Sequence, residues 1–412
     1  MATPLAFAAP SVPGERLLQL DVLRGLAIFG VLMVIIGYFC GADLALEAGL
    51  SYSMGWGGER LYALSGVLLE GKAAALLAIL FGAGLAIQHE SGVKRGVSGL
   101  PFALRRTAAL ALIGTLHTFL LSNIDILLDY AVISLLVLPF LRLSAGRILW
   151  AIPLVLLAAG LISAPALMFA LDLPAAEMHE LNLAHYGQGS WFDALEYRIW
   201  ETVAVVGPMR LANRLVILAP FFIVGVAAWK SGLLLAPAQH RRTLVWVFVL
   251  CFGCGLVANL LPQEDLNRWA NQLSVRPLRV LIKASFFLAK LCLTFGYAAG
   301  VLLLLQHSMW RRCLAVMAPL GRMALTQYLL QSVICTTIFY GFGIGLYGKL
   351  PMIWVLLLGV SLFALQVIAS WIWLAHFRLG PVEWVWRRLS YGRATPTSAI
   401  ARVDPPEQRG HP

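Results

Sequence analysis

A histidine and two aspartates flank a short polar turn between two apolar segments. His117 ends one segment, and Asp125 and Asp129 open the next. Asp125 and Asp129 are four residues apart, so a helix would place them on one face. A histidine that faces a carboxylate across a tight hairpin has the residue types of a general base held by an orienting acid. The same groups could relay a proton, and a histidine in apolar surroundings is often a satisfied core residue, so the cluster alone does not select a reaction.

Two further groups place opposite charges within apolar segments. Asp21 and Arg24 are three residues apart, on one helical face, and can form an ion pair at the headgroups. Alternatively, Arg24 holds a phosphate near the membrane surface. Glu70 and Lys72 flank Gly71, and residues two apart on a helix point in different directions. Either each meets a partner on another helix, as in a neutralised structural network, or Gly71 marks a break in the helix.

A fourth polar group lies in the apolar segment 314–340. Arg322 and Thr326 are four residues apart, as are Gln327 and Gln331. Polar residues this frequent are expected inside a bundle, as interhelical hydrogen-bond partners or as part of a functional path. We expect a polar interior formed by Asp129, Tyr130, Thr326, Gln327 and Gln331. His179 and His185 in the outer loop show no helical metal-ligand spacing, and the sequence predicts no metal site.

The composition indicates what must position these groups. Of the 412 residues, 60% are hydrophobic and only 12% are charged. A water-soluble fold cannot bury that much apolar surface, so lipid is the expected solvent. A membrane-spanning helix needs roughly 20 mostly apolar residues. Segments that meet or approach this length are 17–39, 61–88, 103–122, 125–141, 148–171, 211–229, 243–262, 279–305, 314–340 and 351–376. The sequence therefore predicts an all-α, polytopic membrane bundle of about ten transmembrane helices.

The distribution of positive charge predicts the orientation. The net charge is +11, and most lysines and arginines fall in one alternate set of connections. The positive-inside rule places that set, and both termini, in the cytoplasm. These short clusters read as topology signals, and no basic arm or zinc-finger spacing indicates nucleic-acid binding. We expect disordered tails at 1–15 and 392–412, and a single transmembrane domain at 16–391 with an outer loop at 172–210. Within that loop, 191–200 has amphipathic spacing, which predicts a helix along the outer interface or a solvated helix packed over the bundle.

The order of these pieces resembles the YeiB family of bacterial membrane proteins. Seven motifs spanning about 21–392 carry the resemblance: Asp21-x-x-Arg24-Gly25-x-Ala27-Ile28, Glu70-Gly71-Lys72 with Leu80-Phe81-Gly82-x-Gly84, Leu116-His117, Asp125-Ile126-Leu127-x-x-Tyr130, Gly321-Arg322-Met323-x-Leu325-Thr326, Tyr340-Gly341-x-Gly343-x-Gly345-Leu346, and Gly380-Pro381-x-Glu383-Trp384. The chain departs from the family where Thr118 and Ile124 replace two glycines, and where Asp129 stands at a position that is often small. These departures change the turn beside Asp125.

That family looks like a relative of the transmembrane acyltransferases, which share the Asp-x-x-Arg-Gly opening. Such proteins move an acyl group from a cytoplasmic coenzyme A thioester to an acceptor across or within the membrane. The resemblance implies a bacterial plasma (inner) membrane protein with no bound cofactor, with acyl-coenzyme A as co-substrate and a glycan, lipid or small molecule as acceptor. The implied catalytic residues are His117, Asp125 and Glu70, and the implied donor-binding residues are Arg24, Asp21, Lys72 and Arg322. Because His117 is expected near the outer face, the thioester must enter a tunnel or the hairpin must dip into the roughly 30 Å hydrocarbon core.

The sequence leaves two other functions open. It predicts no oligomeric state. In a proton-coupled transporter, a conducting path would be formed by Glu70, Lys72, His117, Asp125 and Asp129. No inverted repeat or pair of broken helices is visible, which argues against a transporter. In a membrane scaffold, the same charges would form only a structural network.

Overall fold

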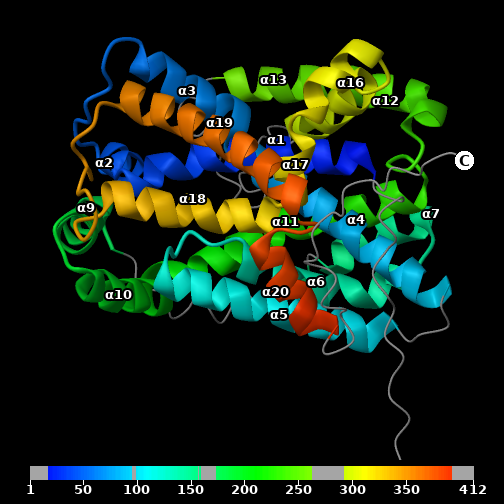
Figure 1. Cartoon of the computed structure of the whole chain (residues 1–412), viewed down its shortest axis with the longest axis horizontal. Helices are drawn as coiled ribbons and strands as arrows, with labels where there is room; N and C mark the ends of the chain where they lie inside the picture. Colours follow the sequence, from blue (N-terminus) through cyan, green and yellow to red (C-terminus); the bar gives the residue numbers. More distant parts are fainter. Residues whose placement is uncertain (1–16, 95–98, 156, 159–172, 262–291, 392–412) are drawn as a thin grey trace, which may run out of the picture.

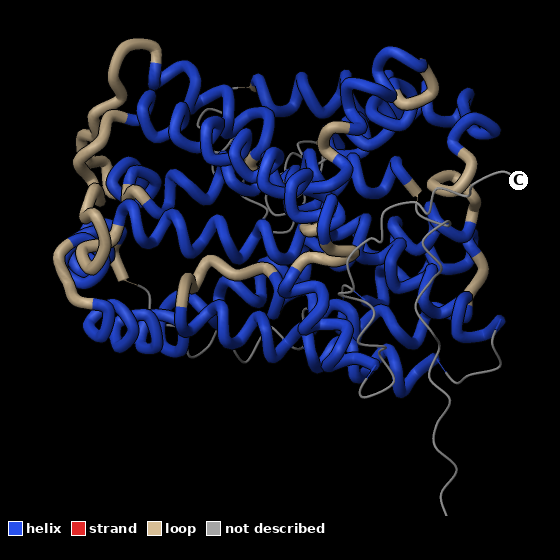
Figure 2. Tube along the Cα trace, in the orientation of Figure 1, coloured by secondary structure: helices blue, strands red, loops and turns tan. Residues whose placement is uncertain are grey.

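The fold is helical throughout the part of the chain that the structure describes. The structure is a computed structural model, and it describes residues 17–94, 99–155, 157–158, 173–261 and 292–391. Helices and connecting loops account for these ranges, with no strand among them (Figure 2), which confirms the all-α prediction. The predicted tails at 1–15 and 392–412 lie outside the described residues, as do most of 148–171 and part of 279–305.

Several helices are long and apolar enough to cross a membrane. Among the described residues there are 4: Leu18–Phe39, Gly58–Val93, Pro237–Leu260 and Met352–His376. A fifth is reached if Cys292–Leu304 and Ser308–Ala315, which are bent by 116° to each other, count as one span. The chain is thus a helical protein with membrane-capable helices. The other predicted segments also form helices, but these are shorter, more polar or only partly described.

Helix α1 (Leu18–Phe39) packs against early helices and against helices from the last quarter of the chain. In Figure 1, α1, α5 (Gly99–Leu120) and α18 (Ala324–Phe339) run along the long axis of the molecule. Close packing joins α4 (Lys72–Lys94) to α11 (Val206–Lys230). A Cβ on Gly82 would lie 2.1 Å from the carbonyl oxygen of Phe222, and one on Gly225 would lie 2.0 Å from that of Ile79. Only glycine allows the two backbones to approach this closely, as small residues do at membrane helix interfaces.

Two of the predicted spans are broken. The helix α3 (Gly58–Leu69) ends at Glu70, Gly71 takes a φ of +73°, and α4 begins at Lys72. This is the break that the Glu70-Gly71-Lys72 spacing allowed. Carbonyl groups at the end of α3 find side-chain donors, because Lys72 Nζ lies 3.2 Å from the Gly66 oxygen and the Tyr297 hydroxyl lies 2.9 Å from the Leu68 oxygen. Such replacement is what makes irregular backbone tolerable at membrane depth.

The second break separates α17 (Ala318–Arg322) from α18 at Met323. A Cβ on Gly321 would lie 1.8 Å from the carbonyl oxygen of Asp21, so α17 rests directly on the start of α1. The predicted segment 125–141 forms only a short α-helix, α6 (Leu127–Val137). The chain then passes into the 3-10 turn Leu138–Arg142.

The segment 172–210 is mostly helical instead of a loop with one separate helix. It contains α9 (Ala175–Asn182) and α10 (Trp191–Trp200). The π-helical turn Glu201–Val205 joins α10 to α11, so helical backbone runs from Trp191 to Lys230 without interruption. The expected amphipathic helix is therefore an extension of α11, with Arg198 facing inward at 1% exposure and Phe192 facing outward at 74%.

The remaining elements complete the bundle. α20 (Pro381–Tyr391) crosses α5 (Figure 1), where Trp386 Nε1 donates to the Arg106 carbonyl at 3.1 Å. Further helices in the described part of the chain include α2 (Ala42–Glu47), α7 (Ala145–Ile148), α12 (Arg241–Val247), α13 (Gly253–Leu260), α16 (Ser308–Ala315) and α19 (Met352–His376).

Candidate active site

His117 lies between an acid and a hydroxyl group. Its Nδ1 is 2.8 Å from Asp125 Oδ1, and its Nε2 is 2.8 Å from Ser332 Oγ. The three residues are 2%, 5% and 1% exposed, respectively. They come from the last turn of α5, the turn before α6, and the middle of α18. The sequence-based pairing of His117 with Asp125 is present, and the structure adds a serine as the third member.

The hairpin between α5 and α6 fixes Asp125 in place. Its Oδ2 accepts a hydrogen bond from the Leu128 backbone N–H at 2.8 Å, which satisfies a free donor at the start of α6. Gly114 lies one turn before His117, and a Cβ there would be 2.6 Å from the Leu128 nitrogen and 3.0 Å from Asp125 Oδ2. Glycine at 114 therefore lets the two helices close around the carboxylate.

The hydrogen-bond partners assign the direction of each bond. With Asp125 taken as a carboxylate, which can only accept, the imidazole proton is assigned to Nδ1. Nε2 is then the acceptor, and the Ser332 hydroxyl donates to it. Tyr328, one turn before Ser332, donates to the Ile124 carbonyl at 3.1 Å and lies 3.4 Å from Asp125 Oδ1. This is the order of groups found in serine–histidine–aspartate catalysis.

An arginine from a fourth helix joins the cluster. Arg214 of α11 donates from Nη1 to Asp129 Oδ2 at 2.8 Å and to the Asp125 carbonyl oxygen. The side chains of Arg214 and Asp129 are 22% and 9% exposed. The guanidinium thus joins the Asp129 carboxylate to the backbone of Asp125, and so links α11 to the turn that holds this acid.

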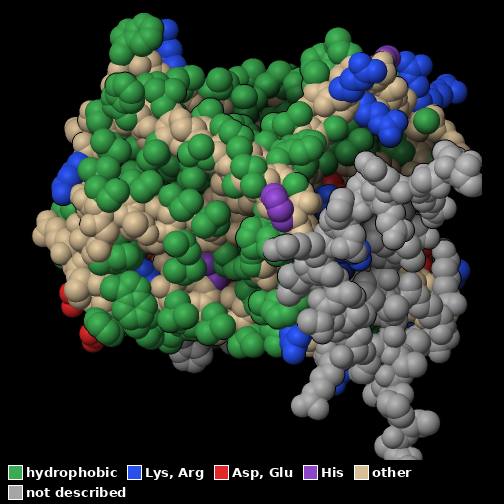
Figure 3. All heavy atoms as spheres, viewed as in Figure 1, with side chains coloured by type: hydrophobic (Ala, Val, Ile, Leu, Met, Phe, Trp, Pro, Cys, Tyr) green, Lys and Arg blue, Asp and Glu red, His purple; other side chains and the backbone are tan. Residues whose placement is uncertain are grey.

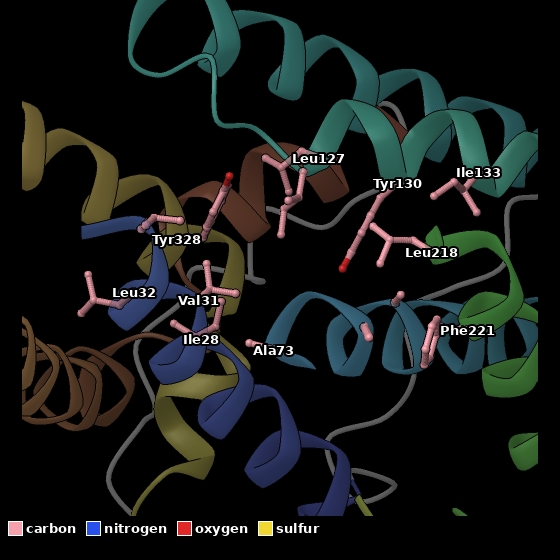
Figure 4. Close-up of a cluster of buried hydrophobic side chains, with 14 of the residues drawn as sticks. Ile28, Val31, Leu32, Ala73, Leu127, Tyr130, Ile133, Leu218, Phe221 and Tyr328 are labelled. Atoms are coloured by element: carbon pink, nitrogen blue, oxygen red, sulfur yellow. The ribbon is translucent and has the colours of Figure 1, made fainter. Parts of the chain in front are cut away.

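Tyr130 belongs to the apolar core and does not line this cluster. Figure 4 shows Tyr130 from α6 and Tyr328 from α18 entering the same core from two sides, with Ile28 and Val31 of α1 nearby. The Tyr130 hydroxyl donates to the Ala74 carbonyl of α4. Its role in the described structure is to tie α6 to α4.

The charged residues near the start of α1 and at the α3–α4 break lie in other places. Asp21 and Arg24 form an ion pair at 2.9 Å, with Asp21 8% exposed. Lys72 is 4% exposed and reaches back to the end of α3. Glu70 is exposed at the break, so the structure does not bring it together with His117 and Asp125.

The polar residues of α17 and α18 face two directions. Gln327 Nε2 donates to Ser370 Oγ at 2.8 Å and Gln331 Nε2 to Gln366 Oε1 at 2.9 Å, which joins α18 to α19. Ser332 and Tyr328 face α5 and α6 instead. The predicted polar interior is thus divided into an interhelical network and the His117 cluster.

Thr326 and Arg322 contact the segment that leads into α20. The Glu383 carboxylate accepts from the backbone N–H of Leu325 at 2.8 Å and that of Thr326 at 3.0 Å, which caps the start of α18. Burial raises the pKa of the Glu383 carboxyl above its ordinary value. Arg322 Nη2 lies 3.5 Å from the Arg378 carbonyl. These contacts stabilise the break before α18.

Sequence reasoning missed Ser332 and Arg214 as site residues. Ser332 is 215 residues from His117, and its only signal was its i, i+4 spacing from Tyr328. Arg214 had a signal, because it falls inside the predicted span 211–229, where a charge is costly and marks a functional candidate. A second buried polar group was also missed: Arg198 Nη1 donates to the Phe119 carbonyl at 3.1 Å, and the Tyr186 hydroxyl donates to Glu201 Oε2 at 2.7 Å.

Comparison with known proteins places the sequence among bacterial relatives. Residues 228–393 match the family model DUF418, described as a protein of unknown function. The chain is 32% identical to the uncharacterized protein YxaH of Bacillus subtilis over 96% of this chain and 99% of that protein. It is 29% identical to the uncharacterized protein YeiB of Escherichia coli over 93% of this chain and 98% of that protein. No solved structure gives a significant match.

Proposed function

The chain belongs to the YeiB-like DUF418 family, and on that premise we propose that it is a membrane-embedded acyltransferase. It would move an acyl group from a cytoplasmic acyl-coenzyme A to an envelope glycan, a lipid or a small-molecule acceptor. The observation that carries the proposal is the buried His117, with Asp125 on one ring nitrogen and a hydroxyl on the other, each at 2.8 Å.

The geometry supports general-base catalysis at His117. A hydroxyl group already donates a hydrogen bond to Nε2, and an acceptor alcohol or amine would make the same contact before it attacks an acyl carbonyl carbon. Asp125 holds the ring in the tautomer that leaves Nε2 free to take this proton. When the carbon–sulfur bond breaks, the thiolate of coenzyme A leaves and receives the proton.

The donor would enter at the end of the molecule where arginines gather. Figure 3 shows lysine and arginine side chains over α16 and α12 at this end, beside a largely apolar surface. A recess of about 430 Å³ there is lined by Leu18, Gln306, Ser308, Arg311, Arg312 and Ala315. Guanidinium groups are suited to the phosphates of coenzyme A. Asp21, Arg24, Lys72 and Arg322 do not line this recess, and their place on the donor side of the path stays a prediction.

The proposal includes the orientation expected from the sequence. The arginine-rich end would face the cytoplasm of a bacterial inner membrane, with both termini inside and about ten spans in total. His117 and Ser332 are 2% and 1% exposed, so transfer requires a movement that opens a path to them. The breaks at Gly71 and Met323 are places where helices could move relative to one another.

The test is acyl transfer by purified protein in lipid nanodiscs. Labelled acetyl-coenzyme A is supplied with glycan, lipid and small-molecule fractions of a bacterial envelope. We expect transfer by the wild type and by His376→Gln, because His376 is exposed and its ring forms a hydrogen bond with the Ile372 carbonyl of its own helix. His117→Gln should reduce transfer by about 10²–10⁴-fold. If the wild type neither binds the donor nor transfers its acyl group to any fraction, the proposal is wrong.

One observation favours a second candidate, a proton-coupled small-molecule transporter. Discontinuous helices often form transporter binding sites, and the α3–α4 break lies beside the buried Lys72. Flux into liposomes that depends on a proton gradient, and that Glu70→Gln abolishes, would favour the transporter over the enzyme. Absence of such flux, together with acyl transfer, would exclude it.

A further inference from the structure

Ser332 forms a hydrogen bond to another helix, unlike six other serine and threonine side chains in the described helices. In membrane helices a serine or threonine commonly donates to the carbonyl four residues earlier. Six side chains in the described helices do so: Ser134, Thr336, Thr337, Ser361, Ser370 and Ser390. Ser332 instead bonds to the imidazole of His117. Its hydroxyl is therefore directed at a base from another helix.

The remaining contacts hold this serine in the geometry of an activated nucleophile. Ser332 Oγ, His117 Nε2, His117 Nδ1 and Asp125 Oδ1 form a continuous chain with two 2.8 Å links. Activation of a serine requires a base within hydrogen-bond reach and a third group that orients the base. The Leu128 N–H orients Asp125 in turn. Along the sequence the three residues occur in the order histidine, aspartate, serine. A catalytic set of this kind is recognised by its geometry and not by its order in the sequence.

We propose that Ser332 is the nucleophile that carries the acyl group between donor and acceptor. This inference rests on the proposed acyltransferase function and specifies its covalent step. Ser332 Oγ attacks the thioester carbonyl carbon, and His117 Nε2 takes the hydroxyl proton. The carbon–sulfur bond breaks, and the proton on His117 passes to the leaving thiolate, which gives free coenzyme A and an ester on Ser332.

The second half-reaction returns the enzyme to its starting state. His117 removes a proton from the acceptor hydroxyl or amine, whose oxygen or nitrogen attacks the ester carbonyl. The bond to Ser332 Oγ breaks, and the proton returns to that oxygen. No oxidant or further reactant is needed, because one acyl group is exchanged for one proton in each step.

Single-turnover experiments in nanodiscs test the covalent step. Without acceptor, acetyl-coenzyme A should release one equivalent of free coenzyme A and leave an acetyl group on the peptide that contains Ser332, measured by mass spectrometry. Ser332→Ala should lower overall transfer by about 10³-fold or more. Ser332→Cys should form a thioester at the same position. Ser361→Ala is the matched control, because that exposed hydroxyl bonds only within its own helix, and it should match the wild type.

A fluorophosphonate probe reacts with activated serines without any acyl donor. Its labelling of Ser332 therefore tests the role of this serine separately from acyl transfer. Transfer that continues in Ser332→Ala within about threefold of the wild type overturns the inference and leaves the acyltransferase intact. If the wild type shows no acyl transfer at all, the proposed function fails. In that case, probe labelling confined to Ser332 still supports its role as a nucleophile, and lack of labelling overturns it.

Discussion

The ion pair between Arg214 and Asp129 gives the clearest quantitative prediction for stability. Arg214→Met keeps the length and apolar stem of the side chain and removes its charge. The substitution leaves Asp129 Oδ2 without the 2.8 Å donor and removes a donor from the Asp125 carbonyl. Loss of one partner of a buried pair typically costs about 3–5 kcal/mol, because the other charge stays buried.

The structure places the expected value at the lower end of that range. The Arg214 side chain is 22% exposed, so water partly solvates its charge, and Asp129 has a further interaction besides this ion pair. We therefore expect Arg214→Met to lower the free energy of unfolding by about 3 kcal/mol. Adding Asp129→Asn removes the unpaired charge, so the double variant should recover at least half of that loss.

Reversible unfolding in mixed lipid–detergent micelles, followed by circular dichroism, provides the assay. The matched control is Arg242→Met, which removes an exposed arginine at the start of α12 and should change stability by less than about 0.5 kcal/mol. If Arg214→Met is as stable as the control, or if the two substitutions simply add, the two side chains are not coupled and the described charge arrangement is wrong.

Three further predictions follow from individual contacts. Asp125→Asn should lower acyl transfer by about 10²–10⁴-fold in a protein that still folds, because an amide does not hold the Nδ1–H tautomer of the imidazole; transfer assays in nanodiscs with equal folded protein test this. Burial raises the pKa of Asp43, beyond the end of α1, from 3.8 to about 6. The folded state then binds more protons than the unfolded state between these values, so this carboxyl should lower stability by about 3 kcal/mol as the pH rises from about 4 to about 6; across this range the stability of the wild type should fall more steeply than that of Asp43→Asn, which keeps only the slope from groups such as Glu383. Gly82→Ala should destabilise the protein by about 1–3 kcal/mol, whereas Gly84→Ala, where a Cβ meets nothing within 4 Å, should not; equal unfolding midpoints for the two would contradict the described α4–α11 contact.

The sequence predicted the parts of the site that are close along the chain. His117 and Asp125 are eight residues apart across a short turn, so the hairpin that pairs them is local. The Asp21–Arg24 ion pair was predicted for the same reason, since helical spacing alone brings these side chains together. The interhelical bonds of Gln327 and Gln331 follow the expectation that polar groups in apolar helices face other helices.

Contacts between distant segments could not be predicted in this way. Ser332 reaches His117 only because α18 packs beside α5, and no local rule fixes which face of α18 turns toward which helix. Arg214 and Glu70 show two opposite errors of prediction: a site residue that was missed and a predicted site residue that lies elsewhere. A charge at the edge of a predicted span proved to be part of the site, whereas a charge near the middle of one proved to be exposed at a helix break.

Two features of the fold had ambiguous signals in the sequence. The Glu70-Gly71-Lys72 spacing allowed either a regular helix whose two charges meet partners on other helices or a break at Gly71, and the φ of +73° at Gly71 identifies the break. The segment 172–210 looked like a loop because it is more polar than the spans. The π-helical turn Glu201–Val205 lets α10 continue into α11, and such turns have no reliable sequence pattern.

The central claim is that an acyl group reaches the buried group formed by His117, Asp125 and Ser332. The most direct measurement uses an acyl-coenzyme A whose acyl chain carries a photoreactive diazirine, bound to the protein in nanodiscs and then illuminated. We predict cross-links in the peptides of α5, the α5–α6 turn and α18, and their loss when unlabelled acyl-coenzyme A is added in excess. Cross-links confined to the lipid-facing surface, or unaffected by this competition, would contradict the claim.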